Sequence, residues 1–244
     1  MSTRPRARRT SDLTRREARS DMSLRSKILS ILIFMLKVFY EDNHLIAVYK
    51  PAGVLVQADK GGEKCLMDEV KEYLKEKYKK QGNVFLGLLH RLDRPVSGIV
   101  LFAKTSKGAS RLSEQFRNHT IAKIYHAEVL GIPKKEKSTL VNYLIKNEDK
   151  NKVAVYDQDV SGSQRAELDY EVIKKDGANS ILKIVLKTGR PHQIRSQLAH
   201  IGCPIKGDLK YGAPAALLDK SIALSAVSLT FVTATSGEIK TIVC

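Results

Sequence analysis

The stretch HRLDRPVSG, residues 90–98, places four charged or ionisable residues between two apolar runs, VFLGLL (84–89) and IVLFA (99–103). The apolar runs are typical of buried segments, so the charged stretch is expected in a loop at the rim of a sheet, where chemistry is commonly found. Asp93 is the only carboxylate of this stretch, and Arg91 and Arg94 flank it. The stretch by itself leaves two readings open: Asp93 is either a structural ion-pair partner or a reactive group.

A second polar segment, KTGRPHQIR (187–195), also follows a β-rich run and gathers its charged and polar residues around a Gly and a Pro. Two such segments, about a hundred residues apart, are expected to meet in space. An arginine from the second would keep Asp93 ionised and fix its orientation. The alternative for the second segment is a basic surface loop.

Composition indicates the class of partner. The 244 residues carry a formal net charge of +16, with 43% hydrophobic residues. This charge points to a polyanion, most often nucleic acid, with an anionic membrane surface as the weaker alternative. Cys65, Cys203 and Cys244 are far apart and form no CxxC or Cys/His cluster, so we expect neither a disulfide framework nor a zinc site, and a reducing cytoplasmic setting.

The N-terminal residues 1–27 differ from the rest, since they hold nine Arg and Lys against three acids and few large apolar residues. We expect them to be a disordered basic arm. The apolar run ILSILIFML (28–36) is then the first buried segment of a single domain, residues 28–244. A targeting signal is the alternative, but no small-residue cleavage site follows the run, and it is too short to span a bilayer.

Hydrophobic periodicity predicts the elements of that domain. Helices are expected at 65–80, 106–119 and 192–202, the last ending at Gly202. Strands are expected at 44–51, 98–104, 121–131, 152–157, 167–176, 180–189, 221–234 and 238–244. Long runs of strands with a few interleaved helices predict an α+β fold with a largely antiparallel sheet.

Five segments in order resemble the RluA-type RNA pseudouridine synthases. They are DNHLIAVYKPAGVLV (42–56), HRLDRPVSGIVLFAKT (90–105), FRNHTIAKIYHAEVLG (116–131), TGRPHQIRSQLAHIGCPIKGDLKYG (188–212) and ALSAVSLTF (223–231). HRLD followed by SG, together with GR-x-HQIR and GD-x-x-YG downstream, is a specific combination. The resemblance covers residues 38–243.

The resemblance implies one catalytic domain with a long, twisted, mostly antiparallel sheet, flanking helices and an active-site cleft across the sheet. It implies an isomerase that converts a uridine in structured RNA to pseudouridine without a metal or nucleotide cofactor. The RNA is expected to be ribosomal, with transfer RNA possible, and the protein is expected to be a monomer that binds no membrane.

By the same resemblance, Asp93 is the essential carboxylate, Tyr125 stacks under the uracil, and Arg190 pairs with Asp93. Arg91 is expected to fill the gap left by the flipped base. Further substrate or RNA contacts are expected from His90, His192, Gln193 and Arg195.

The chain departs from the family pattern at two positions. Val96 stands where the family usually has Thr, and Ser225 stands where it usually has His. The basic arm occupies the end where many members carry a small RNA-binding domain. Two rival functions therefore stay open: a catalytically silent RNA-binding or ribosome-assembly protein on the same fold, and a nucleoside hydrolase or glycosidase, which would need a second carboxylate beside Asp93.

Overall fold

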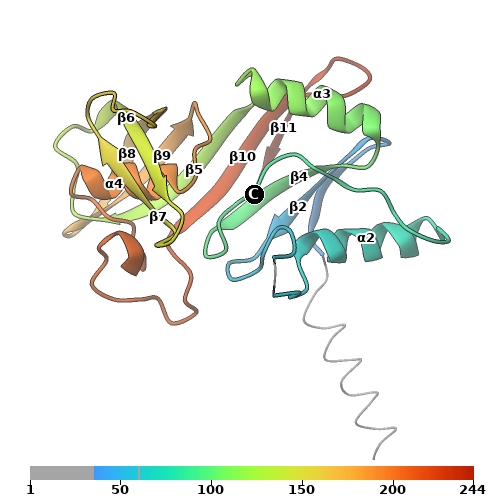
Figure 1. The fold of residues 1–244 in the computed structure, drawn as a ribbon, viewed down its shortest axis with the longest axis horizontal. Coiled ribbons are helices and arrows are strands. Elements are labelled where there is room, and N and C mark those ends of the chain that lie inside the picture. Colours follow the sequence, from blue (N-terminus) through green and yellow to red (C-terminus); the bar gives the residue numbers. More distant parts are fainter. Residues whose placement is uncertain (1–35, 60) are drawn as a thin grey trace, which may run out of the picture. The chain divides into compact units, whose positions relative to one another are not determined.

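An eleven-stranded sheet runs through the protein (Figure 1), in the order β1-β2-β4-β10-β5-β9-β8-β6-β7, with β11 paired to β10 and β3 to β4. The strand pairs are antiparallel except β4 with β10, which are parallel. The strands are β1 (Val38–Glu41), β2 (Leu45–Lys50), β3 (Gly87–Leu88), β4 (Ser97–Ala103), β5 (Ala122–Leu130), β6 (Lys137–Asn147), β7 (Lys152–Tyr156), β8 (Gln164–Asp176), β9 (Asn179–Leu186), β10 (Leu224–Val232) and β11 (Ile239–Val243). The predicted α+β class with a mostly antiparallel sheet is confirmed.

This computed structural model describes residues 36–59 and 61–244, and Val38–Cys244 form one compact unit. The predicted arm (1–27) and all but the last residue of the apolar run 28–36 lie outside the described residues. The predicted domain start at residue 28 therefore stays a prediction. None of the helices described in residues 36–59 and 61–244 is long and apolar enough to cross a membrane.

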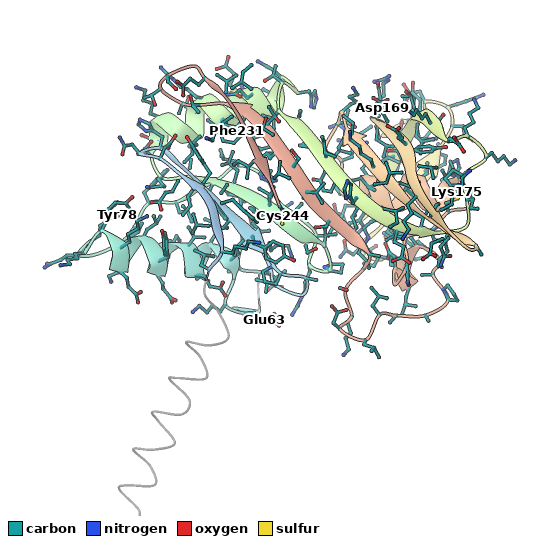
Figure 2. The ribbon with its side chains drawn as sticks, turned by 180° about the vertical axis from the view of Figure 1, so that it is seen from behind. Glu63, Tyr78, Asp169, Lys175, Phe231 and Cys244 are labelled. Carbon is teal, nitrogen blue, oxygen red and sulfur yellow. The ribbon has the colours of Figure 1, made fainter. Side chains whose placement is uncertain are left out.

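Two helices cover the two faces of β2 and β4. Figure 1 shows α3 (Ser106–Arg117) along one side of these strands and α2 (Leu66–Lys77) along the other. Nearly all residues of β2 and β4 are buried, as expected for strands covered on both faces. The α3 side holds a core in which Leu112 packs with strand residues such as Leu101 and Phe231, which Figure 2 labels on β10.

A further helix, α4 (Gln193–His200), packs against β6 and β7 at the other end of the sheet and is followed by the 3₁₀ turn η1 (Leu209–Tyr211). It ends as predicted, since Gly202 follows with a left-handed φ of 79°.

Gly98 explains the SG that follows the HRLD stretch. It lies in the only parallel strand pair among the described residues, in which Ser97 and Gly98 of β4 face Ser225 and Ala226 of β10. Its φ is +123°, and an added Cβ would lie 2.5 Å from the backbone nitrogen of Ala226. Only glycine allows the two strands to approach this closely, so this residue sets where the loop carrying Asp93 meets β10.

The helices and strands predicted from periodicity are all present, with bounds shifted by a few residues. Strands β1, β3 and β6 were not predicted. β6 is eleven residues long and only two of them, Asn142 and Leu144, are fully buried, which weakens its apolar alternation.

Candidate active site

The loop that carries Asp93 is held from three directions. Its turn is closed by a 3.0 Å hydrogen bond from the Val96 N–H to the Asp93 carbonyl. The Arg94 carbonyl accepts bonds from the Gly53 N–H at 2.7 Å and from the Lys50 Nζ at 3.1 Å. Lys50 has no exposed surface, and its burial lowers its pKa to about 8, although the charge of Asp93 opposes this shift. The Asp93 backbone is therefore fixed by buried contacts before any substrate binds.

Arg195 joins Asp93 to a second carboxylate. Its Nη1 lies 2.8 Å from Asp93 Oδ2, while its Nε and Nη2 bond both oxygens of Asp208 at 2.7 and 2.9 Å. Burial by itself would lower the pKa of the guanidinium, but the hydrogen bonds and charges of Asp208 and Asp93 raise it above its usual value. A single fixed cation thus orients both acids.

The two polar segments meet, as predicted, but the predicted partner of Asp93 was wrong. Arg190 turns away toward β8, where its Nε donates to the Arg165 carbonyl at 3.1 Å. Arg190 lies in the turn before α4, whereas Arg195 lies within the buried face of that helix. Arg195, which was predicted as an RNA contact, is 5% exposed and is the cation that holds Asp93.

His192 completes the surroundings of Asp93. It precedes α4 with a left-handed φ of 49°, and its Nδ1 lies 2.8 Å from the hydroxyl of Tyr211. Its Nε2 lies 3.9 Å from Asp93 Oδ2. Burial lowers the pKa of His192, partly opposed by the charge of Asp93, so a neutral ring beside the carboxylate is favoured at neutral pH.

Tyr125 lies on β5 and is buried. It is 8% exposed, and burial together with the charge of Asp93 raises its pKa. The phenol is therefore neutral at physiological pH and close enough to Asp93 to feel its charge. The predicted stacking of Tyr125 under the uracil stays a prediction.

Two of the predicted RNA contacts have their polar groups occupied inside the protein. His90 Nε2 accepts the Leu101 N–H at 3.0 Å, and its ring stacks on Phe116; burial, and then the charge of Lys123, lower the pKa of His90 to about 3. Gln193 is 3% exposed and bonds Thr188 and the carbonyl of Glu167.

We therefore correct the assignment of His90 and Gln193: both stabilise the loops that shape the site. Arg91, in contrast, is exposed on the loop beside Asp93, where a contact with RNA is sterically open.

The two departures from the family pattern lie at the junction of β4 and β10. Ser225, in place of the usual His, faces Ser97 across the parallel pair, with the two hydroxyls 3.2 Å apart. Val96, in place of the usual Thr, is 3% exposed and packed. Both substitutions leave the contacts of Asp93 with Arg195 in place.

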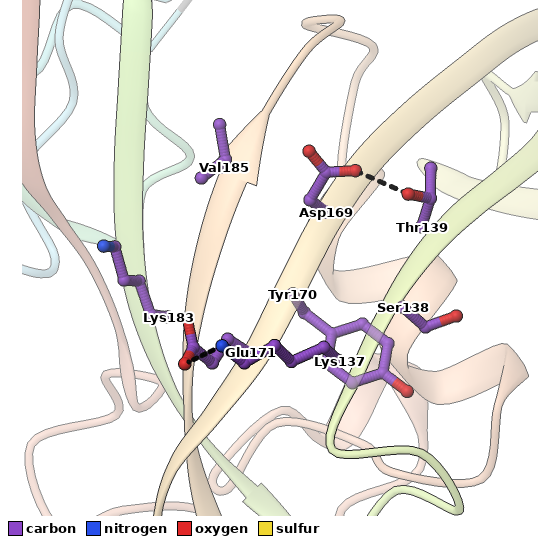
Figure 3. A pocket seen from close by; sticks show the side chains of 8 residues that line it. All are labelled: Lys137, Ser138, Thr139, Asp169, Tyr170, Glu171, Lys183 and Val185. Carbon is purple, nitrogen blue, oxygen red and sulfur yellow. Dashed lines mark hydrogen bonds and ion pairs between the residues drawn. The ribbon is translucent and has the colours of Figure 1, made fainter.

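A pocket on β6, β8 and β9 lies apart from these residues (Figure 3). Eight residues line it: Lys137, Ser138, Thr139, Asp169, Tyr170, Glu171, Lys183 and Val185. Its acids are already paired, since Lys137 lies 2.7 Å from Glu171 and Lys187 lies 3.0 Å from Asp169. None of the predicted site residues belongs to this pocket, and the predicted cleft across the sheet stays a prediction.

Sequence reasoning missed three residues of the site, which are Lys50, Asp208 and Tyr211. Asp208 and Tyr211 both belong to the GDLKYG segment, which was noted for the resemblance but given no role. Asp208 is 1% exposed, and a buried acid requires a cation, which Arg195 supplies. Lys50 carried a weaker signal: a lysine ending a strand that is otherwise apolar, directly before a Pro-Ala-Gly turn.

Comparison with known proteins identifies the family of the chain. A family model described as RNA pseudouridylate synthase matches residues 44–200. A protein named ribosomal large subunit pseudouridine synthase C from Buchnera aphidicola is 36% identical over 176 residues, which are 72% of this chain and 54% of that protein. A protein named tRNA pseudouridine synthase C from Vibrio cholerae is 34% identical over 192 residues, which are 73% of this chain and 75% of that protein.

The fold agrees with a solved structure, titled human RNA pseudouridylate synthase domain containing 4. The TM-score is 0.71 at 22% identity, with 85% of this chain and 87% of that chain covered. At this level of identity the likeness supports the fold alone. Because the family model matches well over half of its residues, the chain belongs to the RNA pseudouridylate synthase family, whose members are isomerases that convert uridine in RNA to pseudouridine.

Proposed function

We propose that this chain isomerises a uridine in structured RNA to pseudouridine, with Asp93 as the essential carboxylate. The observation that carries the proposal is the ion cluster in which Arg195 binds Asp93 on one side and the buried Asp208 on the other. Oδ2 of Asp93 is held by the guanidinium, and the side chain remains 27% exposed, so a substrate can reach it.

The reaction needs an ionised, oriented carboxylate at the junction of ribose and base. The bond between ribose carbon 1′ and uracil nitrogen 1 breaks, the uracil turns, and its carbon 5 joins the ribose. Carboxylates do comparable work beside glycosidic bonds in glycosidases, as nucleophile or as base. Tyr125 would lie against the uracil ring. Because burial and Asp93 raise its pKa, its hydroxyl serves as a hydrogen-bonding group in the neutral form.

RNA is the proposed partner because the chain carries a net charge of +16. A base inside a helix must leave the stack to reach Asp93, at a cost of a few kcal/mol, and phosphate contacts with Lys and Arg offset this cost. The names of the relatives divide between ribosomal and transfer RNA. We favour ribosomal RNA, with transfer RNA as the alternative, and we propose that the protein acts as a monomer.

The two rival functions make different demands on the site. A hydrolase needs a second reactive carboxylate, but the neighbouring Asp208 is 1% exposed and both its oxygens are bound by Arg195. A silent RNA-binding protein has no need to hold one carboxylate accessible beside a neutral histidine and tyrosine. The isomerase accounts for both features.

The test is Asp93→Asn, assayed by mapping pseudouridine in ribosomal and transfer RNA after incubation with each protein. We expect RNA binding to persist and isomerisation to disappear, because the amide is neither an anion nor a base. Asp169→Asn is the matched control and should keep wild-type turnover, because Asp169 lies on the pocket of β6, β8 and β9 (the outer pocket), apart from Asp93. Release of free uracil by the wild type would support a hydrolase, and binding without any product would support the silent protein.

A further inference from the structure

Lys123 is a buried cation with no counter-ion among residues 36–59 and 61–244. It lies on β5 two residues before Tyr125, so both side chains project from the same face of the strand. It is 8% exposed, and its cross-strand neighbour on β10 is Leu229, a residue of the apolar core. Among the described residues, no hydrogen bond, ion pair or ring contact engages its ammonium group.

The surroundings of Lys123 place it between the two polar segments. A Cβ added to Gly189, in the turn before α4, would lie 3.8 Å from Lys123 Nζ. On the other side its charge lowers the pKa of His90, the first residue of the HRLD stretch. The ammonium group is thus bordered by the same two loops that bring Asp93 and Arg195 together.

An unpaired buried ammonium is costly, so proteins rarely keep one without use. Burial lowers the pKa of Lys123, and no nearby acid offsets that shift. The other buried cations of the site are satisfied: Lys50 by three carbonyls and Arg195 by two carboxylates. Lys123 differs from both, which indicates that its acceptor arrives with the substrate.

We propose that Lys123 is a further substrate-binding residue, whose ammonium group donates a hydrogen bond to a carbonyl oxygen of the target uracil. This rests on the proposed function, because it needs a uridine in contact with Tyr125. Residues two apart on a strand are about 7 Å apart, so a base lying against Tyr125 is within reach of the Lys123 side chain.

A uracil carbonyl fits the site better than a phosphate. A phosphodiester has to keep its other oxygens hydrated, and a group that is 8% exposed offers little water. Exposed cations such as Arg91 are available to bind the phosphates of the RNA backbone. When the bond from carbon 1′ to nitrogen 1 breaks, its electron pair leaves with the uracil, whose carbonyl oxygens share the negative charge, while the electron deficiency stays on the ribose facing Asp93. A cation at a carbonyl oxygen therefore stabilises the uracil more strongly after the bond has broken than before.

The test compares Lys123→Met with Lys183→Met, which also removes one positive charge but on the outer pocket of β9. On an RNA that the wild type modifies, we expect Lys123→Met to slow single-turnover isomerisation by about 100- to 1000-fold, as for removal of other transition-state donors. RNA affinity should stay within about threefold, and the slope of log affinity against log salt should not change. The thermal midpoint should stay the same or rise, since an unpaired buried charge is removed.

RNA with 2-thiouridine or 4-thiouridine at the target identifies the contact, because sulfur is a weaker hydrogen-bond acceptor than oxygen. One of the two should slow the wild type while leaving Lys123→Met no slower than it is on unmodified RNA.

Three outcomes would overturn the proposal. A weaker affinity with a salt slope reduced by about one unit, at unchanged saturated rate, would place Lys123 at a phosphate. Behaviour equal to that of Lys183→Met would make Lys123 structural. Both results leave the proposed function standing, whereas a wild type that forms no pseudouridine in any RNA overturns the function together with the contact.

Discussion

Replacing Arg195 with Met would break the ion cluster while keeping a side chain about as long as the aliphatic part of arginine. Two carboxylates would lose their cation: Asp208, which is 1% exposed, and Asp93, which is 27% exposed. Removing one partner of a buried pair typically costs about 3–5 kcal/mol, because an uncompensated charge is left inside. Most of this cost falls on Asp208, since water can still reach Asp93.

For a unit of this size, about 1 kcal/mol corresponds to roughly 2–4 °C in the thermal midpoint, so Arg195→Met should lower Tm by about 6–20 °C. Adding Asp208→Asn to Arg195→Met removes the buried charge, and the double variant should regain at least half of that decrease. Turnover should not return with it, because Asp93 remains unoriented, and a misplacement of about 1 Å can cost about 100-fold in rate.

Arg195→Lys should be intermediate in stability and poor in turnover. A single ammonium group keeps the charge but cannot reach Asp93 Oδ2 and both oxygens of Asp208 as the planar guanidinium does. The measurements are thermal denaturation and single-turnover assays. Arg165→Met is the control, since its pair with Glu167 is largely exposed and worth about 0–1 kcal/mol. A Tm for Arg195→Met equal to that of the control, or wild-type turnover in any Arg195 variant, would refute the reasoning.

Three further predictions concern the rest of the chain. Gly98→Ala should lower Tm far more than Gly162→Ala, because both positions have positive φ but only the first places a Cβ against Ala226; equal decreases would mean that the crossing of β4 and β10 adapts. Burial would raise the pKa of Glu41, but hydrogen bonds from Lys104 and other donors lower it to about 2. A carboxylate with a lowered pKa stabilises the folded state above its unfolded pKa, and this stability is lost as the pH falls through the folded pKa. Glu41→Gln should therefore flatten the fall of Tm between about pH 4.5 and 2. Deleting residues 1–27 should weaken the salt dependence of RNA affinity by about 0.7–0.9 in slope for each phosphate that the segment neutralises, and an unchanged slope would remove that segment from the interface.

Local sequence patterns predicted most of the helices and strands. The apolar alternation of β5 and β9 and the helical spacing of Leu66, Val70 and Leu74 in α2 are properties of short segments, and they predict those elements correctly. β6 was not predicted because its inward positions include the polar Asn142, whose amide oxygen accepts a 2.8 Å hydrogen bond from Gln197 of α4. The parallel contact of β4 with β10 joins residues more than a hundred positions apart, and Gly98 was its only signal in the sequence.

The choice between Arg190 and Arg195 shows where the sequence held more information than the motif. In QIRSQLAH, Ile194 and Leu198 are four apart and both buried, and Arg195, three residues before Leu198, lies beside them on the buried side of the helix. An arginine on a buried stripe needs carboxylates, and Asp208 follows shortly after the helix. Arg190, before a proline and outside the helix, carries no such requirement. What the sequence could not show is that the guanidinium serves two acids with different exposure. Asp208 is buried and fixes the arginine, and the arginine fixes Asp93, so Asp93 is the acid that water can reach and the one that we propose to react.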